Sequence, residues 1–435
     1  MTATIRNAEE LGQTPLRRDA LAIAEAAYAA IDTHTVLKEA VRLEGDTLTV
    51  AGHTYALPPG KGVWVVGAGK SSIIAAASLE EILGARIAGG VIIDVADTGH
   101  RLPLKNLEGF IGTHPKPSEH NAEATARLLE VLAPLGEDDV VIALVSGGGS
   151  TLLAHPEAPV TVATEVAVFE ELTAAGASIE EMNTVRKHLS KARGGGVAAA
   201  AYPAQVISLV FSDVPGNDLE FISSGPTVRD DTTVADAEAV IKKYHVQALS
   251  GMPLLETPKE EKYFARVHNE LLVTNVRALE AMKRAARARG YTPQIVTDRF
   301  SGKAHEIAAQ VAAALRAAAP GTALLYGGES TVTLGIHVGR GGRNQELALA
   351  GLAHIADDEL ILPFSSDGHD NTDNAGALCD SMTKAHAVTY ALDTSDYLDA
   401  HRSYDFFTTT GDALITGYTG ANVSDLIIAL KSTSA

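Results

Sequence analysis

The sequence contains a single cysteine, Cys379, and one tryptophan among its 435 residues. One cysteine excludes an internal disulfide, and a reducing compartment fits this composition. No apolar run reaches the length of a membrane-spanning helix, and the first residues lack the apolar region of a signal peptide. We therefore expect a cytoplasmic protein that does not insert into a membrane.

Basic residues are also in the minority. Lys and Arg total 35 against 54 Asp and Glu, which gives a formal net charge of −19. Nucleic acids and anionic membranes require a basic surface, so this balance argues against both as partners. An acidic protein can still bind an anionic substrate in a locally basic cleft. Isolated Lys and Arg residues beside glycine-rich loops are therefore the first places to search for a site.

The remaining composition is that of a globular protein, with 46% hydrophobic and 20% charged residues. A chain of 435 residues is longer than a domain with a single hydrophobic core usually is, so two domains are expected. Apolar segments at 62–69, 140–148 and 205–214 alternate with helical patterns, which is typical of an α/β fold with a mostly parallel sheet. A polar, proline-containing stretch near 250–264 separates this series from a second one. We predict domains at 1–255 and 263–435.

The stretch VWVVGAGKSS, residues 63–72, predicts a strand, a tight turn and a helix. It resembles a nucleotide loop but fits neither common pattern. The P-loop requires glycine where Trp64 stands, and the dinucleotide fingerprint usually has Gly or Ala where Ser72 stands. The loop therefore has to be interpreted together with the other strand ends, because ligands of open α/β sheets bind beyond the carboxyl ends of the strands.

Two more strand ends carry candidate ligand groups. Ser146–Ser150, SGGGS, follows a buried strand, and its successive N–H groups can form a nest for an anion, with a tight turn as the alternative. Asp213 and Asp218 follow another strand. Either acid can hold Mg²⁺ or serve as a general base, and the alternative is a helix cap or an Asx turn.

Basic residues gather at two places. Residues 183–191 carry four basic or titratable side chains, which can match a phosphate or carboxylate or simply form a solvated helix face. Arg343 begins an Ala/Leu-rich helix, where its charge opposes the helix dipole, so an anionic ligand is a reasonable explanation. His114 and His188 are expected to be structural or to orient a substrate. The oxygen-rich segment 365–373 lacks EF-hand spacing and is expected to be a lid or a loop beside a metal.

Eight motifs occur in a fixed order: GAGKSS, THPKPSEHN, LVSGGGSTLL, NTVRKHLSKARGGG, FSDVPGNDLEFISSGPTV, GGESTVTL, GRGGRNQE and TGYTGANVSDLII. This series resembles the type II glycerate kinases, the family with a C-terminal MOFRL domain, from about Leu21 to Leu430. The resemblance implies a Rossmann-like N-terminal domain, a smaller α/β C-terminal domain and an active cleft between them. It also implies ATP-dependent phosphorylation of D-glycerate, usually to 2-phosphoglycerate, with Mg²⁺, and is compatible with a homodimer.

The resemblance implies Lys70 and Arg343 as catalytic residues, and we expect Asp213 to be the catalytic acid that orients the substrate hydroxyl. A lysine at a helix N-terminus makes a compact cationic site for a phosphate or a carboxylate. The metal is expected at Asp213 and Asp218. Contacts to substrate or nucleotide are expected from Gly67, Gly69, Ser71, Ser146, Gly147, Gly148, Gly149, Ser150, Asn183, Arg186, Lys187, Glu329, Asn344 and Asp367.

Two loops depart from the family pattern, DGHDNTDNAGA at 367–377 and GYTGANV at 417–423. His369 and Tyr418 are larger than the residues expected there, so a related sugar acid such as a four-carbon aldonate stays an alternative substrate. An NAD(P)H-dependent hydroxypyruvate reductase is a second alternative, since Asp94 falls roughly where a ribose-binding acid should stand. A non-enzymatic nucleotide or sugar-acid sensor is a third.

Overall fold

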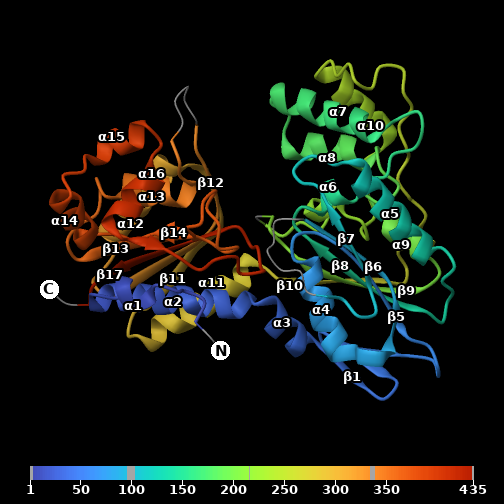
Figure 1. Ribbon diagram of the computed structural model, residues 1–435, viewed down its shortest axis with the longest axis horizontal. Coiled ribbons are helices and arrows are strands. Elements are labelled where there is room, and N and C mark those ends of the chain that lie inside the picture. The colour runs from blue at the N-terminus through green and yellow to red at the C-terminus, as the bar shows by residue number, and fades with distance from the viewer. Residues whose placement is uncertain (1–2, 96–102, 215, 334–338, 434–435) are drawn as a thin grey trace. The chain divides into compact units, whose positions relative to one another are not determined.

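The computed structural model describes residues 3–95, 103–214, 216–333 and 339–433. The chain folds into two compact units. One is continuous and comprises residues 33–273, and we call it the central unit. The other combines residues 1–32 with 274–435, and we call it the terminal unit. In Figure 1 the terminal unit therefore contains both the darkest blue and the orange to red parts of the ribbon.

The central unit is built on a parallel sheet. Its main strands are β4 (Val63–Ala68), β6 (Val91–Val95), β7 (Glu108–Gly112), β8 (Val140–Ser146), β9 (Gln205–Phe211) and β10 (Val267–Val273). They lie in the order β10-β9-β8-β4-β6-β7, with β5 (Ile87–Gly89) paired to β4, and each of these pairings is parallel. The order reverses between β4 and β8, which makes this point the topological switch of a doubly wound sheet.

Helices cover this sheet because its central strands are apolar on both sides. They are α3 (Thr33–Ala40), α4 (Ser72–Leu83), α5 (Glu119–Leu132), α6 (Gly149–Leu152), α7 (Val162–Ala174), α8 (Ile179–Lys187), α9 (Gly196–Ala201) and α10 (Val234–Lys243). Side chains that accept from the third backbone N–H begin several of them, for example Thr161 at α7 and Ser178 at α8.

A separate three-stranded antiparallel sheet precedes the parallel one. It consists of β1 (Val41–Glu44), β2 (Thr47–Val50) and β3 (His53–Ala56). Val50 pairs with His53, so Ala51 and Gly52 form the turn of a hairpin. Both turn residues have positive φ, 47° and 87°, as a two-residue type I′ turn requires.

The terminal unit contains a mixed sheet. Its strands are β11 (Thr292–Lys303), β12 (Thr322–Thr331), β13 (Glu359–Ser365), β14 (Gly376–Ala377), β15 (Cys379–Asp380), β16 (Ala413–Leu414) and β17 (Asp425–Lys431). The order is β11-β12-β17-β13-β14-β16, with β15 on β13, and only the β11–β12 pairing among these described strands is parallel. The helices are α1 (Ala8–Leu11), α2 (Pro15–Ile31), α11 (Asn275–Ala288), α12 (Ala304–Ala317), α13 (Arg343–Gly351), α14 (Ser381–Thr389), α15 (Thr394–Asp399) and α16 (Ser403–Thr410).

The division into units differs from the predicted domains 1–255 and 263–435 at both ends. β10 pairs with β9 and thus belongs to the central sheet, so the chain leaves that unit only after Val273. The first 32 residues belong to the terminal unit because α2 packs on α11 and because buried Arg17 bonds Asp380 and Asp412 at 2.6 and 2.8 Å. The α/β fold class itself, with one mostly parallel sheet and a second sheet domain, is confirmed.

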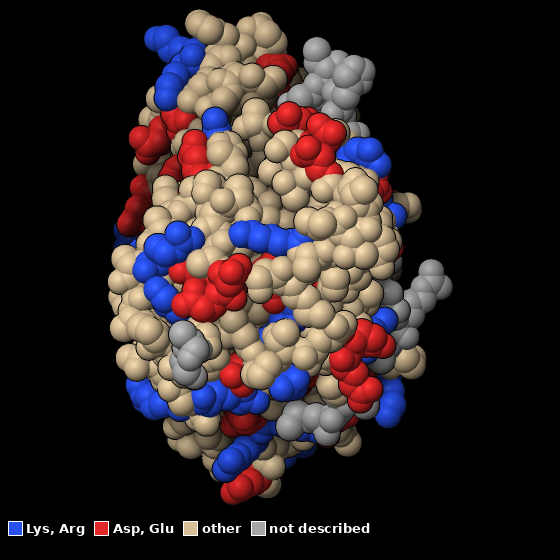
Figure 2. All heavy atoms as spheres, turned by 90° about the vertical axis from the view of Figure 1, so that its left-hand side faces the viewer, with Lys and Arg blue, Asp and Glu red and all other residues tan. Residues whose placement is uncertain are grey.

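Charges of both signs are interspersed on the face drawn in Figure 2. Lys and Arg side chains on this face alternate with Asp and Glu rather than forming one continuous basic area. Within the described ranges, no helix is both long and apolar enough to span a bilayer.

Candidate functional site

The two loops on either side of the switch point are bonded together. The Lys70 N–H, at the start of the turn after β4, donates to the Gly147 carbonyl after β8 at 2.9 Å. The next N–H, that of Ser71, donates to Ser146 Oγ at 3.3 Å. Gly69 has φ 138°, and a Cβ there would lie 2.0 Å from Ser146 Oγ. Glycine is therefore required for the loops to approach this closely.

Three other strand ends bring polar groups to the SGGGS loop, which itself follows β8. A Cβ on Gly147 would lie 1.9 Å from Asp213 Oδ2, so this glycine makes room for the carboxylate that follows β9. A Cβ on Gly148 would lie 3.4 Å from both Lys70 Cγ and His114 Cδ2, and His114 follows β7. The structure thus brings Lys70, Asp213 and the predicted glycine loop together and adds His114 to them.

The surroundings of His114 are electropositive. Its pKa is lowered to about 4, first by the restricted hydration of the ring and then by the positive charges of Lys70 and Arg186. Arg186 stacks on the Phe169 ring at 4.1 Å, and burial followed by the charge of Arg193 lowers its own pKa to about 10. His114 is therefore a neutral imidazole at pH 7 beside two cations. This combination suits an anionic ligand that also carries a hydroxyl.

A loop with two strained serine residues is hydrogen-bonded to the glycine loop. Ser223 and Ser224 both have left-handed backbones, with φ of 54° and 59°, which is costly for residues other than glycine. Ser223 Oγ donates to the Ser146 carbonyl at 2.7 Å. Ser224 Oγ donates to Asn183 Oδ1 at 2.9 Å, and it also lies 2.9 Å from the Ser150 hydroxyl. The predicted residues Ser150 and Asn183 are thus linked through Ser224, which belongs to the motif FSDVPGNDLEFISSGPTV.

Asp94 has a structural role in the turn after β4. It is 1% exposed, and its Oδ2 accepts the Ile73 N–H at the start of α4 at 2.9 Å. Burial raises its pKa to about 6, while the Ile73 and Val95 amides and the charge of Lys70 act in the opposite direction. A buried carboxylate that caps α4 is not presented to a ribose. This geometry removes the main support for the reductase alternative.

Several residues that the sequence singled out are committed to packing or turns. Lys187 is 2% exposed and bonds Asp230 at 3.0 Å, and His188 is fully buried with Nδ1 2.8 Å from the Thr184 carbonyl. Gly67 lies inside β4, where a Cβ would approach Leu144 Cβ at 2.8 Å. Asp218 is exposed, and its Oδ1 accepts the Glu220 N–H at 3.0 Å, as in an Asx turn. The pattern of charges along the sequence does not show whether a lysine side chain is buried or exposed to solvent.

The terminal unit holds the remaining predicted residues around Arg343. Its guanidinium is bound by Asp425, with Nε–Oδ2 2.6 Å and Nη2–Oδ1 3.1 Å, and Nη1 pairs with Glu329. Asp425 is fully buried, whereas the Glu329 side chain is 45% exposed. The anion expected beside Arg343 is thus supplied in part by the protein itself. Glu329 is the partner that a ligand can displace at least cost.

Asp370 completes the start of α13. Its two oxygens accept the Asn344 and Gln345 N–H groups at 3.0 and 2.8 Å, so a buried carboxylate occupies the helix N-terminus. The Asn344 side chain is buried and donates to both Asp370 and Asp425. Burial raises the pKa of Asp370, and it raises that of Asp425 to about 7 against the attraction of Arg343. Asn344 therefore organises the carboxylates and is not exposed to a ligand.

A cavity of about 330 Å³ opens beside Arg343 within the terminal unit. Its walls include Glu329, Thr331, Gly341, Glu346, Asn371 and His401. His401 Nδ1 lies 3.0 Å from Glu346, so one imidazole and one carboxylate face each other at the cavity. This space is large enough for a small acid or a phosphate group.

The two loops that depart from the family pattern meet in the same unit. The His369 and Tyr418 rings pack edge to face with centroids 6.1 Å apart, and the Thr419 N–H donates to the Asp367 carbonyl at 3.0 Å. Asp367 Oδ1 accepts from Ser365 Oγ at 2.6 Å and from the His369 N–H at 2.9 Å. Asp367 thus holds its own loop, and the two unexpected ring residues form one pair.

Comparison with known proteins agrees with this arrangement. A domain of unknown function, DUF4147, matches residues 19–252, and the MOFRL family matches residues 322–425. The chain is 34% identical to glycerate 2-kinase of Pyrococcus horikoshii, over 95% of this chain and 97% of that protein. It is 36% identical to D-glycerate 2-kinase of Thermotoga maritima, over 85% and 90%. The chain belongs to the type II glycerate kinase family.

Structural comparison supports the family assignment. The crystal structure of glycerate kinase from Thermotoga maritima superposes with a TM-score of 0.84 at 32% identity, covering 96% of this chain and 99% of that one. A protein of Agrobacterium vitis that is 38% identical over 90% of this chain is provisionally named a hydroxypyruvate reductase. The predicted type II glycerate kinase family with its MOFRL domain is therefore confirmed, while relatives carry two kinds of name.

Proposed function

We propose that this protein phosphorylates D-glycerate on its 2-hydroxyl, with ATP as the phosphoryl donor and 2-phosphoglycerate as the product. The observation that carries the proposal is the group formed by Lys70, His114, Arg186 and Asp213 around the SGGGS loop at the switch point. It combines backbone donors, two cations, a neutral imidazole and a carboxylate, which are the parts that phosphoryl transfer needs. The kinase names of the relatives support the same reaction class.

The roles follow from the chemistry of each group. Backbone N–H groups of Gly147, Gly148 and Gly149 bind phosphate oxygens, and Lys70 neutralises the charge that builds up on them. Asp213 accepts a hydrogen bond from the glycerate hydroxyl and so directs its oxygen toward the phosphorus. His114, neutral at pH 7, can donate one hydrogen bond and accept another without adding charge. Arg343, on the terminal unit, is a further cation that can bind a phosphate oxygen once this oxygen replaces Glu329.

Magnesium fits this set of donors with Asp213 as its protein ligand. Mg²⁺ is usually held by one or two carboxylates together with substrate phosphates and water, so one acid beside a phosphate loop suffices. Asp218 is the second predicted ligand, and one of its oxygens already accepts a backbone N–H. When bound, the ion would supply neutralisation of the phosphate charge.

A coupled assay on the purified protein tests the proposal. Formation of ADP that depends on D-glycerate supports it, and conversion of the product by an enolase identifies 2-phosphoglycerate rather than the 3-isomer. Oxidation of NADH with hydroxypyruvate, without ADP formation, would establish the reductase instead. Binding of ATP or glycerate without turnover would make the protein a sensor.

The substrate range is tested in the same assay with a four-carbon aldonate. Because His369 and Tyr418 pack on each other, we expect them to fill space rather than to open it. D-Glycerate should therefore have the higher kcat/KM. A four-carbon aldonate with the higher value would reassign the substrate while leaving the reaction class intact.

A further inference from the structure

Three potential metal ligands lie together on the central unit, apart from the candidate site. His53 belongs to β3, and His268 and Glu270 belong to β10, the edge strand of the parallel sheet. His268 is the second residue of β10, and the polar groups of the candidate site follow the carboxyl ends of the parallel strands. The group is therefore separated from that site by most of the length of a strand.

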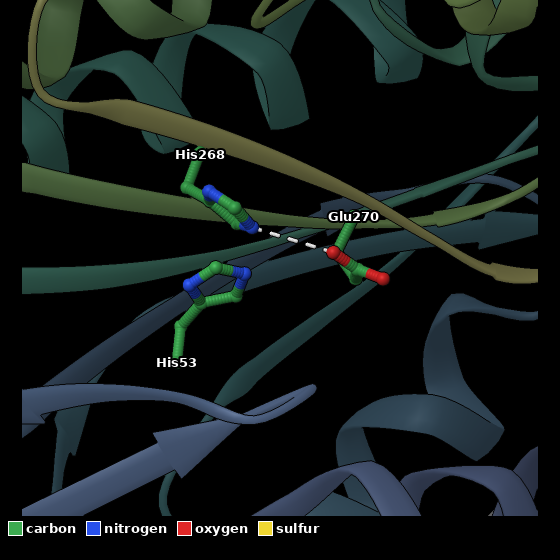
Figure 3. Close-up of side chains that lie close together, drawn as sticks. All are labelled: His53, His268 and Glu270. Carbon is green, nitrogen blue, oxygen red and sulfur yellow. Dashed lines mark hydrogen bonds and ion pairs between the residues drawn. The ribbon is translucent and has the colours of Figure 1, made fainter.

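The backbone explains why these side chains meet. His268 and Glu270 are two residues apart on one strand, so both side chains point to the same face. His53 reaches them from the β2–β3 hairpin, and Figure 3 shows the three side chains directed toward one another. The two imidazole centroids are 4.3 Å apart, and His268 Nε2 lies 3.3 Å from Glu270 Oε2.

We propose that His53, His268 and Glu270 bind a divalent transition-metal ion, with Zn²⁺ as the favoured ion. One ligand atom from each residue lies within 4.8 Å of the other two. Ligands of a tetrahedral zinc ion are roughly 3.3 Å apart when the bonds are 2.0–2.2 Å long. The required contraction is small, and His53 is exposed while the other two are partly exposed, so side-chain rotation alone can supply it.

The ligand types define the class of ion. Two imidazoles and one carboxylate match zinc and its neighbours in the first transition row, whereas Mg²⁺ and Ca²⁺ prefer oxygen alone. Three protein ligands leave a fourth tetrahedral position for water. The site would then resemble an open zinc site in its ligand count.

A bound ion would join two separate pieces of structure. The β1–β2–β3 sheet is not hydrogen-bonded to the parallel sheet among the described strands, and β10 is the edge of the latter. The His53 ring on β3 and the His268 ring on β10 have centroids 4.3 Å apart. The face of β3 therefore already approaches β10. Metal binding would fix the hairpin against this edge and slow its local opening.

Metal content is the first test. Protein stripped with a chelator is dialysed against Zn²⁺ at pH 7.5, and bound zinc is measured by mass spectrometry. His53→Ala and His268→Ala should each bind one equivalent less than the wild type. His120→Ala is the matched control because His120 is exposed, lies 3.4 Å from Glu123 and is outside the three-residue group. Equal zinc binding by wild type and both site variants would overturn the proposal.

Hydrogen exchange locates the ion independently of the kinase reaction. Zn²⁺ should slow amide exchange in residues 47–56 and 267–271 of the wild type, and the slowing should be absent in His53→Ala and absent with Mg²⁺. The hairpin position of His53 is exposed, so the variant should retain the wild-type circular dichroism and melting temperature. Protection that persists in folded His53→Ala, or that appears only elsewhere, would assign the zinc to another site. Neither readout depends on turnover of glycerate.

Discussion

Asp425, fully buried at the first position of β17, holds the Arg343 guanidinium through two parallel contacts of 2.6 and 3.1 Å. This bidentate arrangement fixes the plane and direction of the guanidinium rather than only its charge. The third nitrogen of the group is left to Glu329, whose side chain is 45% exposed. The Arg343 guanidinium is therefore fixed in one orientation, and its Nη1 atom can exchange Glu329 for a ligand.

Arg343→Lys is expected to lower kcat by at least about tenfold, equivalent to roughly 1.4 kcal/mol of barrier. Lysine keeps the charge but cannot contact Asp425 at two points and a phosphate oxygen with a third nitrogen. KM for glycerate should change much less, because the interaction is assigned to the transferring group. Steady-state kinetics separate the two parameters. A steep rise in KM at constant kcat would instead make Arg343 a clamp for the substrate carboxylate.

The activity is expected to fall as pH decreases through about 7, the raised pKa of Asp425. Above this pH the carboxylate is ionised and binds Arg343, and below it protonation removes one of the two contacts. The terminal phosphate of a nucleotide titrates nearby, with a second pKa of about 6, so the wild-type profile alone is insufficient. Asp425→Asn should have a lower kcat, and its activity should no longer fall as the pH decreases through 7. If the activity of this variant still falls near pH 7, the titrating group is the nucleotide phosphate.

Gly147→Ala should reduce kcat by roughly a hundredfold, the effect expected when a catalytic group is displaced by about 1 Å. The new Cβ would lie 1.9 Å from Asp213 Oδ2, so the carboxylate has to move. Gly136→Ala is the matched control, because a Cβ there would approach only Asp139 Oδ2, at an ordinary contact distance of 3.9 Å. Comparable losses in both variants would mean that the effect is a general one of glycine replacement.

Lys70→Ala should abolish most turnover without unfolding the protein. The Lys70 N–H to Gly147 bond involves the backbone and survives the substitution. Because the charge of Lys70 contributes to the lowered pKa of His114, the titration of His114 followed by NMR should move upward in the variant. A folded variant with near wild-type activity would remove Lys70 from the site.

Arg17→Met should destabilise the terminal unit by about 3–5 kcal/mol, the usual cost of leaving a buried charge unpaired. Arg17 is 1% exposed and is the partner of both Asp380 and Asp412. Denaturant unfolding gives the free-energy difference. The neighbouring Arg18→Met is the control, since Arg18 is exposed. The triple variant with Asp380→Asn and Asp412→Asn should recover part of the loss, and a failure to recover any would point to packing of the Arg17 stem.

The central part of the site could be predicted because its chemistry lies at strand ends. Lys70, Gly147 and Asp213 each follow a strand of one parallel sheet, so their meeting depends only on topology. Family resemblance supplied Arg343 but not its partners. Asp425 is 82 residues away on a strand whose position in the mixed sheet is set by long-range pairing.

Elsewhere a local sequence pattern has two physical meanings. In the sequence Lys187 is part of a basic cluster, but its side chain is buried and bonds Asp230. Its neighbour Arg186 lies close enough to His114, beside the glycine loop, to lower the pKa of that residue. Asp94 stands at the end of a strand, as a ribose-binding acid would, but it caps α4. Spacing along the chain cannot decide which face a single charged side chain takes.

The shared membership of residues 1–32 and 274–435 in one unit has a consequence for synthesis on the ribosome. The central unit is complete once its last strand has emerged, and it can fold while translation continues. At that stage Arg17 has been synthesised, but its ion-pair partner Asp380 has not, because Asp380 lies 363 residues later in the chain. Helix α2 is therefore an amphipathic segment without its partner for most of the time of synthesis. A circular permutant that joins the native ends and begins at residue 33 would make both units continuous in sequence. In this permutant the time between the synthesis of Arg17 and that of Asp380 should be shorter.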